Sequence, residues 1–183
     1  MNDDQALEAL DRALQRLPEL VEDQSRWESL VIDRKKPWTY RVSTFLDELW
    51  RVSLHRFATC DEDEASLHPH PWPGAFAILR GRYLMALGRS ETRTERPKNV
   101  AKLLMNEGSR YAITEPLTWH SVSPLVECYT VMVNGPRWPA DVAWAHIRMR
   151  TTEGKGLVAM TGQQLEEHFA VFRELLGRAL ANN

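Results

Sequence analysis

The sequence has 183 residues, of which 43% are hydrophobic and 26% are charged. A chain of this length buries enough surface for one hydrophobic core, so we expect a single compact domain. The formal net charge of −2 excludes a generally basic surface of the kind that binds nucleic acid. No apolar run approaches the ~20 residues that a membrane-spanning helix requires.

The cysteine content and the first residues indicate the compartment. Cys60 and Cys128 are too few for a disulfide framework or for a cysteine-rich zinc site. The sequence opens with acidic and polar residues, whereas a secretory signal begins with basic residues followed by an apolar stretch. We therefore expect a reduced, cytoplasmic protein.

Residues 1–46 are predicted to form an N-terminal helical arm. An apolar stripe recurs at three- and four-residue steps, as expected for one face of an amphipathic helix; its members are Leu7, Leu10, Leu14, Leu17 and Val21. Pro18 interrupts this stripe and predicts a kink or a break. The helical pattern is interpreted as continuing to about residue 35, before Pro37 ends it.

Residues 47–160 show the alternation of short β-strands. Residues 49–58 alternate, and the apolar run 75–79 is bounded by Gly74 and Gly81. Further strands are predicted at 82–87, 109–115, 118–122, 126–133, 142–149 and 157–160, with an exposed loop at 89–99. Many short strands separated by turns indicate a sandwich or a barrel rather than βαβ units.

Residues 161–183 are predicted to form a C-terminal helix. Thr161 and Gln164 fit a capping box at its start. One apolar face then extends along the segment, and its members are Leu165, Phe169, Phe172, Leu175, Leu176 and Leu180.

The most informative short stretch contains two histidines, His68 and His70, within Leu67-His68-Pro69-His70-Pro71-Trp72-Pro73-Gly74. Residues i and i+2 of an extended segment project to the same side, and the interleaved prolines favour such a backbone. Both imidazoles can therefore face one cation, with a third ligand from another strand. The alternative is a turn-rich loop in which the two histidines only form hydrogen bonds.

These residues resemble the first motif of the cupin superfamily, in which His-x-His is followed by a closing glycine, here Gly81. The second cupin motif, a proline and a single histidine, resembles the segment from Pro116 to His120. The resemblance covers about residues 48–150, and it is nearest to small, largely uncharacterised bacterial and phage-associated cupins. It implies a mainly β, cupin-type jelly-roll barrel, which we expect to carry the N-terminal helices and the C-terminal helix.

Two positions depart from the cupin pattern. The acidic metal ligand of the family is expected near Gly74 or Ala75, and neither residue can coordinate a metal; Glu62 stands where the first glycine is expected. The resemblance then implies either a metal site of His68, His70 and His120, as in the thiol dioxygenases of the superfamily, or a site that has lost its metal. Three neutral imidazoles leave open coordination positions on one face of a divalent metal. Iron(II) is the expected metal, with zinc, nickel and manganese as alternatives.

Other residues are candidates for further roles at this site. His55 is a reserve ligand or a partner of the ligands, and Glu127 is an alternative acidic ligand or a general base. Tyr129 and Arg80 are the candidate catalytic residues, to orient the substrate or to handle protons. Arg82 and Tyr83 are weaker candidates for the same roles, or solvated and structural residues. Three further residues are given structural or surface roles: Cys128 in the core, His146 as structural and His168 on the surface.

Three functions fit this sequence. The first is a metal-dependent, oxygenase-type enzyme that acts on a small polar molecule in the mouth of the barrel. The second is a non-enzymatic cupin that binds a small ligand or a protein partner. The third is a metal-free epimerase or isomerase, with a histidine as base and a tyrosine as acid. A homodimer is expected, because edge strands of such barrels commonly pair.

Overall fold

The computed structural model describes residues 1–92, 95–139 and 158–181. The fold is mainly β, with helix α1 (Asp3–Leu20) at the start and helix α2 (Gly162–Ala181) at the end. The strands are β1 (Glu28–Ile32), β2 (Thr39–Phe45), β3 (Arg51–Phe57), β4 (His68–Pro69), β5 (Gly74–Arg80), β6 (Arg82–Arg89), β7 (Ala101–Asn106), β8 (Arg110–Ile113), β9 (Thr118–Pro124) and β10 (Cys128–Asn134). The predicted strand at 142–149 and His146 lie outside the described residues.

Strands β3 to β10 have the connectivity of a jelly roll. The first four pair antiparallel with the last four in reverse order: β3 with β10, β4 with β9, β5 with β8 and β6 with β7. Together with β1 and β2, these strands form two sheets, one in the order β1-β2-β3-β10-β5-β8 and the other in the order β4-β9-β6-β7. This double-sheet arrangement confirms the predicted fold class.

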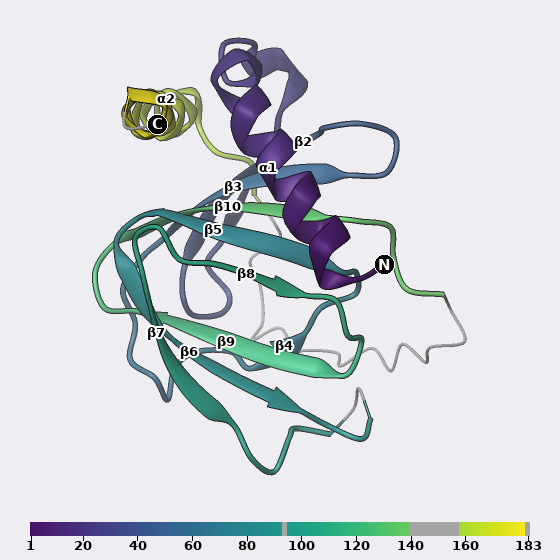
Figure 1. Ribbon diagram of the computed structural model, residues 1–183. Coiled ribbons are helices and arrows are strands. Elements are labelled where there is room, and N and C mark those ends of the chain that lie inside the picture. Colours follow the sequence, from purple (N-terminus) through teal and green to yellow (C-terminus); the bar gives the residue numbers. More distant parts are fainter. Residues whose placement is uncertain (93–94, 140–157, 182–183) are drawn as a thin grey trace.

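The two helices cover one face of the six-stranded sheet, and the four-stranded sheet faces its other side (Figure 1). The side chains of strand β10 are buried along its whole length, because one face packs on the helices and the other on the second sheet. The main core lies between α1, α2 and the outer face of the larger sheet, where Val131, Leu10 and Phe172 are fully buried. The space between the two sheets is therefore separate from the main core, and it holds the site described below.

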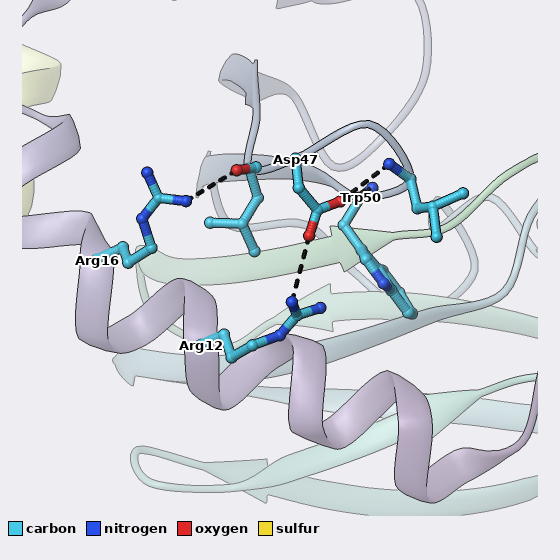
Figure 2. A network of polar contacts seen from close by, with 6 residues as sticks. Arg12, Arg16, Asp47 and Trp50 are labelled. Atoms are coloured by element: carbon cyan, nitrogen blue, oxygen red, sulfur yellow. Dashed lines mark hydrogen bonds and ion pairs between the residues drawn. The ribbon is translucent and has the colours of Figure 1, made fainter.

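Polar contacts fix helix α1 to the turn between β2 and β3 (Figure 2). Arg16 donates a 2.9 Å hydrogen bond to the carbonyl oxygen of Leu46, and Arg12 lies 3.3 Å from the carboxylate of Asp47. The other carboxylate oxygen of Asp47 accepts hydrogen bonds from the backbone of Leu49 and Trp50, at 2.9 and 2.8 Å. Asp47 thus shapes the turn and links it to the helix.

The prediction that helix continues from residue 21 to about residue 35 is wrong, and so is the assignment of all of residues 1–46 to a helical arm. Helix α1 includes Pro18 and ends at Leu20, and β1 and β2 extend the large sheet beyond β3. The apolar residues Trp27, Leu30 and Val31 are too few to distinguish a helix turn from a strand by periodicity. Residues 39–45 alternate between faces and are rich in β-branched residues, which favour a strand.

Most of the other predicted elements are confirmed within a few residues. Gly81 joins β5 to β6 with φ of +92°, and a Cβ there would lie 2.6 Å from the carbonyl oxygen of Glu127. This position therefore requires glycine. Strand β7, which follows the predicted loop, was not predicted, because its residues are mostly exposed and carry no clear apolar alternation.

Helix α2 confirms the predicted capping box, since Thr161 and Gln164 exchange side chain-to-backbone hydrogen bonds of 2.9 and 3.3 Å. The prediction that His168 is a surface residue is wrong, because its side chain is only 2% exposed. It lies one helical turn before Phe172, with the two rings 4.9 Å apart, and so belongs to the same buried face. No helix among the described residues is long and apolar enough to cross a membrane.

Candidate metal centre

His68, His70 and His120 converge between the two sheets. Each contributes a ring nitrogen, and these nitrogens all lie within 4.8 Å of one another. The ring centroids are 5.2 Å apart for His68 and His70, 5.2 Å for His68 and His120, and 4.6 Å for His70 and His120. The structure therefore brings together the three histidines that the sequence selected as metal ligands.

Local backbone geometry explains this convergence. His68 on β4 is the direct cross-strand partner of His120 on β9, which places their side chains on the same face at close range. His70 follows two residues later in the extended segment, and its ring stacks on that of His68 at an interplanar angle of 16°. The i, i+2 spacing and the antiparallel register together generate the three-histidine cluster.

The donor set fits a metal ion. Nδ1 of His68 lies 2.8 Å from the carbonyl oxygen of Ser66, so this nitrogen carries the proton and leaves Nε2 as the available ligand. Such a hydrogen bond to a backbone carbonyl is usual for a metal-ligating histidine. Nε2 of His70 and Nε2 of His120 are 2.6 Å apart, which is a hydrogen-bond distance, and a cation bound to both nitrogens would replace the shared proton. These contacts hold the ligating nitrogens toward one point.

The pKa values of all three histidines favour the neutral form that binds metal. Burial lowers the pKa of His120 to about 4, with the positive charge of Lys35 as a second cause. Burial is also the main cause of the lowered pKa of His68 and of His70, and charge on the neighbouring histidines and on Lys35 contributes. A neutral imidazole offers its lone pair without first releasing a proton.

The cluster opens onto a cavity of about 280 Å³. Aromatic rings form part of the wall: Phe76 meets His70 edge-on at 5.5 Å, and Trp72 does so at 6.4 Å. Tyr111 stacks on Phe76 at 4.7 Å and accepts a 2.9 Å hydrogen bond from the hydroxyl of Tyr83. The apolar wall limits water around the histidines, and the two phenols supply polar groups beside it.

Burial raises the pKa of Tyr83 well above its ordinary value and also raises that of Tyr111, so both phenols keep their protons. Because Tyr83 donates to Tyr111, the hydroxyl proton of Tyr111 is available to another acceptor. Tyr83 was one of the sequence candidates, whereas Tyr111 was missed. Its place opposite Phe76 depends on the pairing of β5 with β8, which the sequence does not reveal.

The candidate catalytic residues Tyr129 and Arg80 are not among the residues that line this cavity. Tyr129 is 3% exposed and packs against Phe172 of α2, on the outer face of the sheet. Arg80 lies over the Tyr129 ring at 4.3 Å, next to a β-bulge that shifts the pairing between β5 and β10. The bulge explains why strand parity could not place Arg80. Neither residue therefore lines the cavity beside the histidine cluster.

Glu127, the alternative acidic ligand, binds other groups. It accepts a 2.6 Å hydrogen bond from the Tyr129 hydroxyl and a 2.7 Å hydrogen bond from Arg56. Partial burial alone would raise its pKa, but these two hydrogen bonds give it a net lowered pKa. Glu127 is thus an ionised partner of Tyr129 and Arg56, and it is not a lining residue of the cavity.

His55 lines the cavity but is not part of the three-histidine group. Gly74, near which the family would place its acidic ligand, is not a lining residue, and a Cβ there would lie 2.8 Å from the carbonyl oxygen of Val133. A longer side chain at this position would therefore clash with the backbone before it reached the site. Cys128 is fully buried, and burial raises the pKa of its thiol to about 12, as expected for a core residue.

Three cations at the cavity were missed by sequence reasoning: Lys35, Lys36 and Arg41. All three were assigned to the helical arm, which was not expected to line the cavity of the barrel. The alternation of Thr39, Arg41 and Ser43 was the available signal, since it places all three side chains on one face of a strand.

No protein-family model matches the sequence, and no curated protein does. The solved structures to which this chain is similar include those of hydroxypropylphosphonic acid epoxidase (HppE). The enzyme from S. wedmorenis matches with a TM-score of 0.45 and 16% identity, over 61% of this chain and 56% of that chain. An iron(II) HppE in complex with substrate matches with a TM-score of 0.46 and 18% identity, over 61% of this chain and 57% of that one. The match thus spans little more than half the length of these proteins.

Proposed function

We propose that this protein is a mononuclear metal enzyme of the cupin type that acts on a small polar molecule within the jelly roll. The observation that carries this proposal is the convergence of three neutral imidazoles on an aromatic-walled cavity. His68, His70 and His120 would hold a divalent transition metal, with iron(II) as the proposed ion. Zinc, nickel or manganese would also accept three imidazole ligands.

The ligand set supports oxygenase chemistry in particular. With three neutral ligands on one side, a bound divalent metal keeps its charge and open positions for a chelating substrate and for oxygen. The protein's own groups would then position the substrate: Phe76 and Trp72 exclude water, and the Tyr111 hydroxyl, which accepts from Tyr83, keeps its own proton to donate to the substrate. His68 is held in one tautomer by the carbonyl of Ser66.

Oxygen consumption tests this function. Protein loaded with iron(II) under anaerobic conditions is mixed with a panel of thiols, β-diketones and 2-oxo acids, and oxygen uptake is followed with an electrode. We expect turnover with at least one class, and its loss in His120→Ala. A protein that retains iron and is inert with every class would support a binding function instead.

The cavity also favours one metal-free alternative. His70 and His120 are kept neutral by burial, and the protonated Tyr111 lines the same cavity, so a base and an acid for an epimerase or isomerase are both present. Turnover that survives exhaustive treatment with a chelator would support this alternative. Turnover that a chelator abolishes and that iron(II) restores would support the metal enzyme.

A further inference from the structure

The charged residues that line the cavity are all cationic, apart from its histidines. Lys35, Lys36 and Arg41 are lining residues, and no aspartate or glutamate of the described chain lines the cavity with them. Lys36 is neutralised elsewhere, since it pairs with Glu64 at 3.6 Å and lies over the ring of Trp38 at 4.6 Å. Lys35 and Arg41 thus remain as the two cations that line the cavity without a paired carboxylate.

The pairing of three neighbouring strands determines the position of Arg41. Arg41 on β2 is the cross-strand partner of His55 on β3, and His55 is the partner of Thr130 on β10. Arg41, His55 and Thr130 all line the cavity, so they form a row of polar side chains across three neighbouring strands, with Arg41 at one end. Arg41 also lines a second cavity of about 290 Å³.

Lys35 reaches the site from the loop between β1 and β2. The backbone N–H of Ser66 donates a 3.1 Å hydrogen bond to the carbonyl oxygen of Lys36, which ties this loop to the segment just before His68. Lys35 lines the same cavity as His68, His70 and His120. The same loop therefore carries a cation to the edge of the histidine cluster.

Neither Lys35 nor Arg41 has a counter-ion in the described part of the chain, where neither forms a salt bridge or a side-chain hydrogen bond. Glu28 acts on Arg41 only at long range, and its carboxylate is bound to Arg51. Burial lowers the pKa of Lys35 to about 8, with Arg41 and Arg34 as further causes. Two half-buried cations beside a metal site are costly unless an anion joins them.

We propose that the substrate of this site carries an anionic group, a carboxylate or a phosphonate or phosphate, that binds between Arg41 and Lys35. This inference rests on the proposed function, because the rest of the substrate would then reach the three histidines across the same cavity. The guanidinium of Arg41 offers paired N–H donors that match two oxygens of such a group, and Lys35 adds a point charge. A cavity of about 280 Å³ is at the small end for ligand sites, which favours a small organic acid.

Anion binding can be measured on the whole protein with and without metal. The probes are propionate, methylphosphonate and inorganic phosphate, titrated calorimetrically at low ionic strength into chelator-treated protein and into zinc-loaded protein. The variants are Arg41→Met and Lys35→Met, and the matched control is Arg82→Met, because Arg82 is exposed and does not line the cavity. The comparison of probes distinguishes a carboxylate from a phosphorus oxyanion.

We expect saturable binding of at least one probe to the wild type, a loss of at least tenfold in affinity in Arg41→Met, a smaller loss in Lys35→Met, and no change in Arg82→Met. Arg41→Lys keeps the charge and serves if Arg41→Met does not fold; it should recover part of the affinity. The proposal is overturned if no probe binds in either metal state, or if the cavity variants bind as well as the control. Anion binding without metal binding would support this site while removing the proposed metal function.

Discussion

Replacing His168 with glutamine should make the protein less sensitive to acid. Burial lowers the pKa of His168 from 6.5 to about 4, and its side chain is almost fully enclosed by α2 and the large sheet. Below about pH 6.5 the unfolded chain takes up a proton at this residue while the folded chain does not. The stability that neutral His168 provides is therefore present above pH 6.5 and is lost as the pH falls toward 4.

The magnitude follows from the two pKa values. Through this residue alone, the free energy of unfolding should be about 2 kcal/mol lower at pH 5 than at pH 7.5. Urea unfolding of chelator-treated protein at both pH values gives the loss of stability for the wild type and for His168→Gln. Other buried histidines titrate in both proteins, so the difference between the two losses isolates His168. An equal loss in both proteins would refute the reasoning.

Three further changes test the fold. Asp47→Ala should cost about 1–2 kcal/mol, because two backbone N–H groups and Arg12 lose their acceptor; thermal unfolding should show no comparable loss in the exposed neighbour variant Glu48→Ala. Truncation after Thr161 removes Phe169 and Phe172, each worth roughly 1.5–3 kcal/mol when buried, so an unchanged melting temperature and mass in solution would contradict the packing of α2. Gly74→Glu should destabilise the protein rather than add a metal ligand, because of the backbone oxygen 2.8 Å from its Cβ position; unchanged stability with tighter metal binding would contradict this.

Much of the fold could be predicted from local patterns. The strands near residues 75–79 and 82–87 are bounded by glycines, and α2 has both a capping box and a clear apolar face. Residues 21–46 were mispredicted because a short apolar run fits both periodicities, and the pairing of β2 with β3 is a long-range property. Strand β7 was missed because an exposed edge strand has no buried face to produce alternation.

The residues of the candidate site also fall into two groups, those that a local pattern predicts and those that depend on strand pairing. The His68 and His70 pair is a local signal, since the i, i+2 spacing alone places both rings on one side. His120 was added from the resemblance to a family, and the register of β4 with β9 brings it to the pair. Arg41 and Tyr111 could not be found, because their places in the cavity depend on which strands are neighbours. Arg80 could not be placed because a β-bulge changes which face of β5 it occupies. Tyr129 follows the regular alternation of β10 and packs against α2 rather than lining the cavity.

Elemental analysis of protein purified without an affinity tag tests the central claim most directly. The three-histidine centre predicts close to one transition-metal ion per chain in the wild type. His68→Ala, His70→Ala and His120→Ala should each lower this content sharply, whereas the matched control His168→Gln should retain it, because His168 lies in the core outside the cluster. Full metal content in the double variant of His68→Ala and His70→Ala would contradict the account.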